Sequence, residues 1–151
     1  MTSSSRRLLY ERSVIHRGYL IIPYLLHEIG KVPIYAYRLL SELGHRGCYH
    51  RANNPSGLHS SHIDGIVAIA KEHLDQQILP IPRPDCFKRR YLYQQNLIII
   101  SEVGGKYFYD HYPPTRLNNI AAPKIFTSEL HCASWVKQGL DRNLEKSTTT
   151  M

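Results

Sequence analysis

The chain has little cysteine and no long apolar run. Its 151 residues include three cysteines, Cys48, Cys86 and Cys132, which are too few and too scattered for a disulfide framework. No stretch approaches the roughly 18 uncharged apolar residues of a membrane span, and residues 1–7 are not followed by the apolar segment of an export signal. We therefore expect a cytoplasmic protein that does not span a membrane.

Recognised catalytic motifs are also missing. The sequence has no nucleophile elbow, P-loop, HExxH zinc motif or paired-glycine dinucleotide motif, and no dense cluster of carboxylates. Cys48 lies near His45 and His50, and Cys132 follows His131, but neighbours in sequence rarely face one another as a catalytic dyad must. We expect no cofactor, and an enzyme (a nuclease or hydrolase) that uses the His/Cys-rich loop is kept as an alternative.

The composition is that of a folded, basic protein. Hydrophobic residues make up 42% of the chain and charged residues 21%, and the formal net charge is +7, so the chain lies outside the range of disordered sequences. The excess positive charge falls in two blocks, residues 1–59 with eight Lys and Arg against three Asp and Glu, and residues 80–126 with seven against three. The length favours one domain, residues 1–151.

Apolar and β-branched segments predict two β-hairpins. The expected strands lie within residues 14–26, 32–40, 96–103 and 106–110. Gly104 and Gly105 suit the positive φ angles of a tight turn. Pro23 and Pro33 cannot donate to a strand ladder, so we expect each at a sheet edge or a strand end. Residues 44–58, rich in Gly, Asn and Pro, are predicted to be a loop.

Two segments predict amphipathic helices. The first begins at Ser60 or Ser61, which can cap it, and ends near Gln77 before a proline-rich run. Its apolar stripe consists of Ile63, Ile66, Val67, Ala70 and Leu74. The second begins after Thr127 or Ser128. Its stripe consists of Leu130, Ala133, Val136, Leu140 and Leu144.

Together these elements predict an α+β fold in which antiparallel hairpins form a sheet with two helices on one face. Both halves of the chain have the order ββα, and the pattern is compatible with duplicated units at residues 6–77 and 89–146, joined by a proline-rich linker at 78–88. One of the short matches between them pairs Lys71-x-x-Leu74-Asp75 with Lys137-x-x-Leu140-Asp141. The alternatives are chance similarity within one domain and two separate ββα lobes.

Tyrosine and positive charge coincide along the chain. All eleven tyrosines lie in the two basic blocks and none in a predicted helix. If the helices cover one sheet face, the other can present tyrosine rings to bases and arginines to phosphates. The residues predicted to bind nucleic acid are Tyr35, Tyr37, Arg38, Arg89, Arg90, Lys106, Tyr107 and Tyr109. The alternative is that tyrosine prefers strands and arginine keeps exposed strands soluble.

A second cluster of interest is the group His45, Cys48, His50, His59 and His62. Four such side chains can bind zinc tetrahedrally, but their spacing matches no standard zinc finger. Cys48, His50, His59 and His62 are therefore weak candidates for metal ligands, and we expect weak zinc binding at most.

The sequence thus favours a small non-catalytic binding or regulatory protein that acts on an acidic partner. Nucleic acid is the leading candidate for that partner, because a basic surface provides affinity that depends little on sequence. The alternative is an adaptor or assembly factor that binds a protein through an edge strand or through Trp135, the sole tryptophan. Either function is compatible with a homo-oligomer. We expect Trp135 itself to widen the core face of the second helix.

Overall fold

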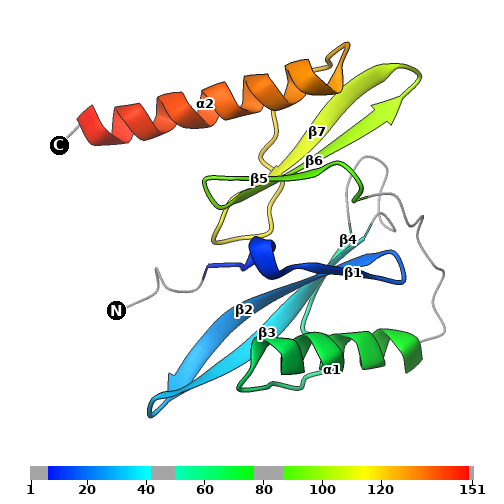
Figure 1. The fold of residues 1–151 in the computed structure, drawn as a ribbon, viewed down its shortest axis with the longest axis vertical. Coiled ribbons are helices and arrows are strands. Elements are labelled where there is room, and N and C mark those ends of the chain that lie inside the picture. The colour runs from blue at the N-terminus through cyan, green and yellow to red at the C-terminus, as the bar shows by residue number, and fades with distance from the viewer. Residues whose placement is uncertain (1–6, 42–49, 77–86, 150–151) are drawn as a thin grey trace. The chain divides into compact units, whose positions relative to one another are not determined.

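The computed structural model describes residues 7–41, 50–76 and 87–149, with only the backbone described for residues 50, 51 and 144–149 (Figure 1). In chain order the elements are the 3-10 helix η2 (Tyr10–Arg12), the strands β1 (Val14–His16), β2 (Tyr19–Ile29), β3 (Val32–Ser41) and β4 (His50–Asn53), the helix α1 (Ile63–Gln76), the strands β5 (Arg90–Tyr93), β6 (Asn96–Val103) and β7 (Lys106–Tyr112), and the helix α2 (Glu129–Thr149). This composition confirms the α+β class. Neither of the two described helices is long and apolar enough to cross a membrane.

The strands form two antiparallel sheets where a single sheet was expected. The first sheet has the order β1-β2-β3-β4 and the second β5-β6-β7. The chain divides into a first unit, Met1–Lys88 with Pro114–Leu117, and a second unit, Arg89–Pro113 with Asn118–Met151. The physical reason for two sheets is that each hairpin ladder has its own apolar helix to cover it, so each half of the sequence completes a separate core.

One core cluster of the first unit lies between its sheet and α1. Its buried members are Ile21, Tyr37, Leu39, Ile66, Val67, Ala70 and Leu74. The four helical members are the stripe predicted from the sequence, apart from Ile63, which packs at the margin. Ser60 Oγ accepts a hydrogen bond from the N–H of His62, the residue that precedes α1, so this bond stabilises the turn into the helix and does not cap an N–H of its first turn.

Three details of the first sheet differ from expectation. The segment 14–26, predicted to be one strand, is divided into β1 and β2, because Arg17 and Gly18 take positive φ angles of 52° and 81° and form a tight turn. Residues 50–53, predicted to be loop, form β4, because Ala52 contributes a side chain to the core and the backbone pairs with β3. Pro23 lies inside β2. β1 starts at Val14, which pairs with Ile21, so no residue of β1 lies beside Pro23. On that side of β2 the Pro23 carbonyl accepts a hydrogen bond from the Leu9 N–H. The missing proline donor therefore faces a local edge.

A short return of the chain completes the first unit. The Leu8 N–H donates to the Pro114 carbonyl at 2.7 Å, and the Tyr10 hydroxyl donates to the Arg116 carbonyl at 3.5 Å. Leu117 is buried. Residues 114–117 thus belong to the first unit, although β7 before them and α2 after them belong to the second.

The second sheet is built from two tight hairpins. Gly104 and Gly105 have φ angles of +60° and +79°, as the predicted turn between β6 and β7 requires. β5 was not predicted. It is joined to β6 by Gln94 and Gln95, which also have positive φ angles, 49° and 66°, without being glycine.

The second core contains aromatic residues and part of the predicted α2 stripe: Val136 is buried, Ala133 and Leu140 pack at the margin, and the Leu144 side chain lies outside the described residues. Its buried members are Ile98, Ile100, Tyr109, Phe126, Cys132 and Val136. Trp135 packs at its margin, with ring centroids 5.6 Å from Phe126, so it widens the core face as expected. Leu130 was predicted to be in the stripe, but it is 77% exposed. The helix begins at Glu129 with Ser128 as its cap, and this start turns Leu130 to solvent.

The two units share their internal strand register. Val14 of β1 pairs with Ile21 of β2, and Tyr91 of β5 pairs with Ile98 of β6. Both isoleucines belong to the core beneath the helix of their own unit. Val14 and Tyr91 therefore occupy equivalent positions, next to the helix in the first strand of each unit.

The helix starts are equivalent as well. Tyr35 of β3 forms an isolated bridge with Ser60, and Tyr107 of β7 forms one with Phe126. Each bridge precedes its helix, α1 or α2, by the same short connection, since the helices begin at Ile63 and Glu129. This alignment makes the residues along α1 and α2 comparable, so that Lys71 and Lys137 hold the same helical position.

Candidate binding groove

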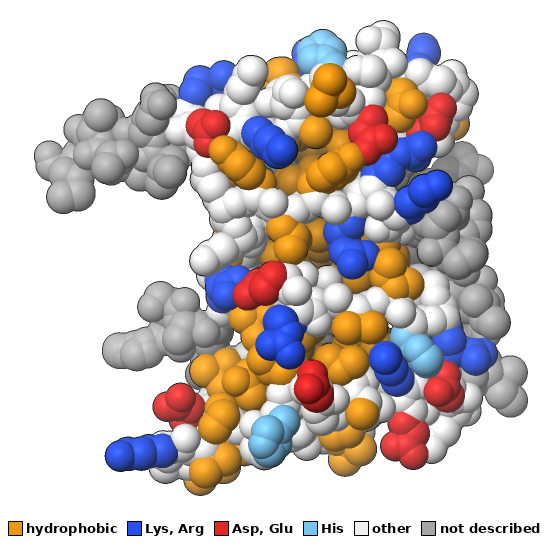
Figure 2. All heavy atoms as spheres, in the orientation of Figure 1, with side chains coloured by type: hydrophobic (Ala, Val, Ile, Leu, Met, Phe, Trp, Pro, Cys, Tyr) orange, Lys and Arg blue, Asp and Glu red, His pale blue; other side chains and the backbone are white. Residues whose placement is uncertain are grey.

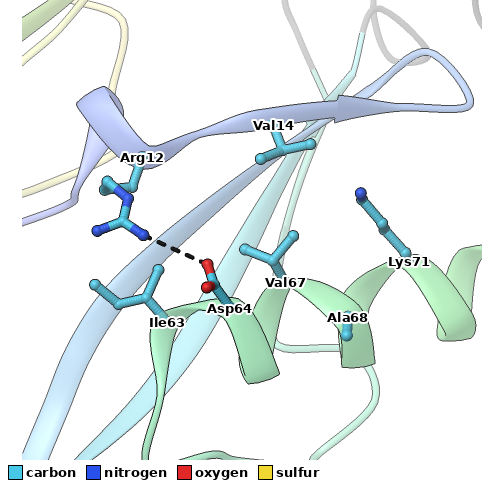
Figure 3. Close-up of a pocket in the computed structure, with 7 residues that line it drawn as sticks. All are labelled: Arg12, Val14, Ile63, Asp64, Val67, Ala68 and Lys71. Carbon is cyan, nitrogen blue, oxygen red and sulfur yellow. Dashed lines mark hydrogen bonds and ion pairs between the residues drawn. The ribbon is translucent and has the colours of Figure 1, made fainter.

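An open groove of about 360 Å³ runs between β1 and α1 in the first unit (Figure 3). It is lined by Arg12, Val14, Ile63, Asp64, Val67, Ala68 and Lys71. Two segments that are distant in sequence form it, the end of η2 with β1 and the first turns of α1. The volume lies near the lower end of the range of about 300–1,000 Å³ that is usual for ligand sites.

The floor of the groove is apolar. Val14 points from β1 toward the helix, and Val67 projects toward it from α1 (Figure 3). Val67 belongs to the buried core, and Val14 and Ile63 pack at its margin. The floor is therefore the outer layer of a packed core, which holds its shape through the contacts beneath it.

The rim of the groove carries two cations and one carboxylate. The Arg12 guanidinium lies 3.5 Å from Asp64 Oδ1, and their side chains are 48% and 97% exposed. So exposed a pair is weak. Asp64 stands in the first turn of α1, where the helix dipole favours a negative charge. Lys71 reaches over the other end of the groove (Figure 3). The rim is thus positive by one charge.

The equivalent place in the second unit is filled by the protein itself. Tyr91 stands where Val14 does, and its hydroxyl donates to Glu129 Oε2 at the start of α2. The Arg89 Nε donates to the other oxygen, Oε1, at 3.0 Å. The Arg89 guanidinium and the Tyr91 phenol therefore both bind the Glu129 carboxylate, and they connect β5 to α2 where the first unit has its groove between β1 and α1.

The tyrosines predicted to stack on bases face the helices. Tyr37 is fully buried in the first core, and Tyr109 is buried in the second. Tyr35 and Tyr107 are half-buried and pack at the margins of the same cores. Alternation along the strands does put each pair on one side, as the sequence indicated, but that side is covered by α1 or α2. Buried rings cannot stack on a base.

The predicted cations are distributed over different surroundings. Arg38 lies on the opposite side of β3 from Tyr35 and Tyr37, with its guanidinium 5.4 Å from the centre of the Tyr24 ring. Its Nε is buried without a hydrogen-bond partner among the described residues. Arg38 therefore does not share a face with the two tyrosines beside it in sequence.

In the second unit the structure does bring two predicted residues together. The Arg89 guanidinium lies 5.9 Å from the centre of the Tyr107 ring and also pairs with Glu102 at 3.4 Å. Burial lowers the pKa of Arg90, and Lys106 is exposed at the start of β7. Arg89 is therefore already paired with two carboxylates, those of Glu102 and Glu129.

The weak metal candidates are only partly within the described residues. His45 and Cys48 lie outside them, and His50 is described by its backbone alone. His59 and His62 are exposed. Within residues 7–41, 50–76 and 87–149, no three His, Cys, Asp or Glu side chains are grouped as metal ligands would be.

The Cys132 thiol has the environment of a core residue. It is fully buried, and this burial raises its pKa to about 11. A thiol with so high a pKa is protonated at neutral pH and is a poor nucleophile. The His131 ring packs instead on Phe126, with centroids 5.2 Å apart.

Charge on the surface is mixed. Figure 2 shows Lys and Arg side chains scattered among acidic and hydrophobic ones on the face that it displays. The groove was not predicted from the sequence, because it depends on the register that sets Val14 opposite α1. The only signal was the Lys71 and Lys137 match, which marks the equivalent helix positions.

Comparison of the chain with protein-family models, curated proteins and solved structures gave no match.

Proposed function

We propose that the protein is a non-catalytic binding protein that holds an acidic partner in the groove of the first unit. The observation that carries this proposal is the combination of an apolar floor with a rim on which Arg12 and Lys71 outnumber Asp64. An apolar centre with a polar, exposed rim is the usual anatomy of a protein-binding site. The partner we favour is an acidic protein segment, whose carboxylates would meet Arg12 and Lys71.

Nucleic acid is the second candidate for the partner. It is supported by the formal net charge of +7 and by exposed cations such as Lys31, Lys106 and Lys124. Binding of this kind would depend on phosphate contacts and fall steeply with salt. Burial of Tyr37 and Tyr109 argues against base stacking on those two rings, and for this reason we rank a protein segment first.

Binding to short labelled peptides tests the proposal. The probe is a set of fluorescein-labelled peptides of the form Gly-Glu-Xaa-Glu-Gly, with Xaa varied, and binding is followed by fluorescence anisotropy. We expect members of the set to bind, and Arg12→Ala and Lys71→Ala each to weaken binding about twofold to fivefold, as the loss of an exposed charge contact does. Lys137→Ala, at the equivalent position of α2, is the matched control and should leave binding unchanged.

Two results would contradict the proposal. One is that no acidic peptide binds at low salt. The other is that the Arg12 and Lys71 variants bind as the wild type does, which would put the partner elsewhere. A labelled single-stranded oligonucleotide measured in parallel tests the second candidate, whose affinity should fall as salt is raised.

We also propose that the two units descend from one duplicated unit of three strands and a helix, the predicted ββα pattern with β1 or β5 added at its start. The support is residue by residue: the first-strand pairs Val14–Ile21 and Tyr91–Ile98, and the bridges made by Tyr35 and Tyr107. The β2–β3 hairpin of the first unit is longer than the β6–β7 hairpin of the second, and β2 carries a bulge between Leu25 and His27.

A cytoplasmic location fits the free, buried Cys132 thiol.

A further inference from the structure

We infer that the groove selects an aromatic side chain next to a carboxylate in the partner's segment. This inference rests on the proposed function and specifies the chemistry of the partner. It comes from the second unit, where the protein's own residues fill the equivalent place.

The aromatic part of the inference follows from Tyr91. Its ring extends from β5 to the start of α2, where the hydroxyl reaches Glu129, and it packs at the margin of the second core. In the first unit the equivalent residue is Val14, whose side chain is too short to cross to α1. The space that the Tyr91 ring fills in one unit is thus left as an open groove in the other.

The carboxylate part follows from Arg89. In the second unit this guanidinium has Glu129 Oε1 at 3.0 Å. In the first unit Arg12 stands just ahead of β1, as Arg89 stands just ahead of β5, but the first residue of α1 is Ile63 and supplies no carboxylate. The nearby Asp64 has its Oδ1 3.5 Å from the Arg12 guanidinium, but its side chain is 97% exposed. A carboxylate from a partner can therefore take the place that Glu129 takes beside Arg89.

The geometry of the rim points to a peptide as the source of both groups. Arg12 and Asp64 are open to solvent, so a ligand seated beside them can continue out of the groove as a chain. The volume of about 360 Å³ is near the lower limit for ligand sites, which suits one aromatic side chain with its acidic neighbour. The groove would not enclose a longer apolar segment.

The peptide set described above tests the selection directly. We expect members with Xaa as Tyr or Phe to bind about tenfold or more tightly than the member with Xaa as Ala, since burial of a large apolar side chain gives an effect of this size. Free N-acetyltyrosine should compete only weakly. If the Ala member binds as tightly as the Tyr member while Arg12→Ala still weakens both, the inference fails and the proposed function stands.

A self-filled variant provides a second test. Val14→Tyr combined with Ile63→Glu places the phenol and carboxylate of the second unit into the first. We expect this double variant to melt as the wild type does and to lose binding of the Tyr peptide at least tenfold. Ile15→Tyr is the matched control, because Ile15 is 39% exposed on the other side of β1; it should bind normally.

The reciprocal variant keeps the inference testable if the first one fails to fold. Tyr91→Val combined with Glu129→Ile removes the residues that fill the second unit and should open a groove beside Arg89. We expect the binding stoichiometry for the Tyr peptide to rise from one to two, as measured by calorimetry. A folded variant that still binds one peptide, or a double Val14 and Ile63 variant that binds normally, would overturn the inference. Variants that still bind the Tyr peptide as the wild type does, and lose only oligonucleotide binding, would overturn the inference as well.

Discussion

His16 Nε2 and Asp75 Oδ1 lie 2.7 Å apart, so the last residue of β1 is joined to the last turn of α1. The second unit repeats this connection, since the Tyr93 hydroxyl at the end of β5 donates to Asp141 Oδ1 at 2.7 Å. In each unit a side-chain contact holds the first strand against the helix, and in the first unit that strand and helix form the walls of the groove.

Replacement of Asp75 by Asn should therefore loosen this end of the groove. Because Asp75 is 52% exposed, we expect a loss of only about 0.2–1 kcal/mol in the free energy of unfolding. Urea denaturation at low salt measures it, and raised salt should shrink the difference from wild type. Glu72→Gln, an exposed carboxylate of the same helix, is the control. A loss as large in that variant would show that net charge, and not the contact with β1, is responsible.

Leu74→Asp should unfold the first unit. Leu74 is 3% exposed within the first core, and burial of an unpaired carboxylate costs several kcal/mol, comparable to the whole stability of a small domain. Leu130→Asp is the matched control, because Leu130 is 77% exposed. Its free energy of unfolding should lie within about 0.5 kcal/mol of the wild-type value. Leu140→Asp, at the margin of the second core, should fall between the two. Circular dichroism melts of the three variants decide the order.

The Cys132 thiol should make the protein less stable at alkaline pH. In the unfolded chain a thiol loses its proton near pH 8.5, whereas burial holds the pKa of folded Cys132 at about 11. Between these values the unfolded state binds fewer protons, so the free energy of unfolding falls as pH rises. The measurement is denaturation at pH values from 8 to 11 for wild type and Cys132→Ala.

The variant isolates this thiol from the other groups that titrate in the same range. We expect a flatter pH dependence in Cys132→Ala, and slow reaction of Cys132 with a thiol reagent until the protein is denatured. Parallel pH profiles for the two proteins would show that Cys132 keeps an ordinary pKa and is accessible.

Gln95→Gly should stabilise the second unit. Gln95 has a φ of 66°, a conformation that costs a residue with a side chain about 1 kcal/mol or more and costs glycine nothing. Glycine also has more freedom to lose on folding, so we expect a net gain of about 0.5 kcal/mol. Gly105→Gln is the reverse change. Its Cβ would meet no atom within 4 Å, so any loss of stability comes from the backbone at φ 79°. Equal stability of all three proteins in thermal melts would contradict this account.

The sequence predicted the helices and one hairpin well, because their signals are local. Ser128 caps the start of α2, the apolar stripe marks α1, and Gly104 with Gly105 marks a turn that few other residues tolerate. β5 was missed for the complementary reason. Gln94 and Gln95 take the same backbone conformation without the residue types that advertise it, and the strand is held by its register with β6.

The site could not be predicted in the same way. Alternation placed Tyr35 with Tyr37 on one side of their strand, but it does not say which side a helix will cover. The groove depends on a difference in size between Val14 and Tyr91 at positions that only the strand pairing makes equivalent. A pattern read along one strand contains neither fact.

The bond between the Leu8 N–H and the Pro114 carbonyl has a consequence for how the protein is made. On the ribosome, residues 7–76 emerge with both walls of the groove, yet the segment that completes the first unit, Pro114–Leu117, is synthesised only after the whole second sheet. The first unit therefore cannot close during its own translation. Leu8 and Tyr10 must wait for a part of the chain that is made later, which ties assembly of the groove-bearing unit to prior synthesis of β5, β6 and β7.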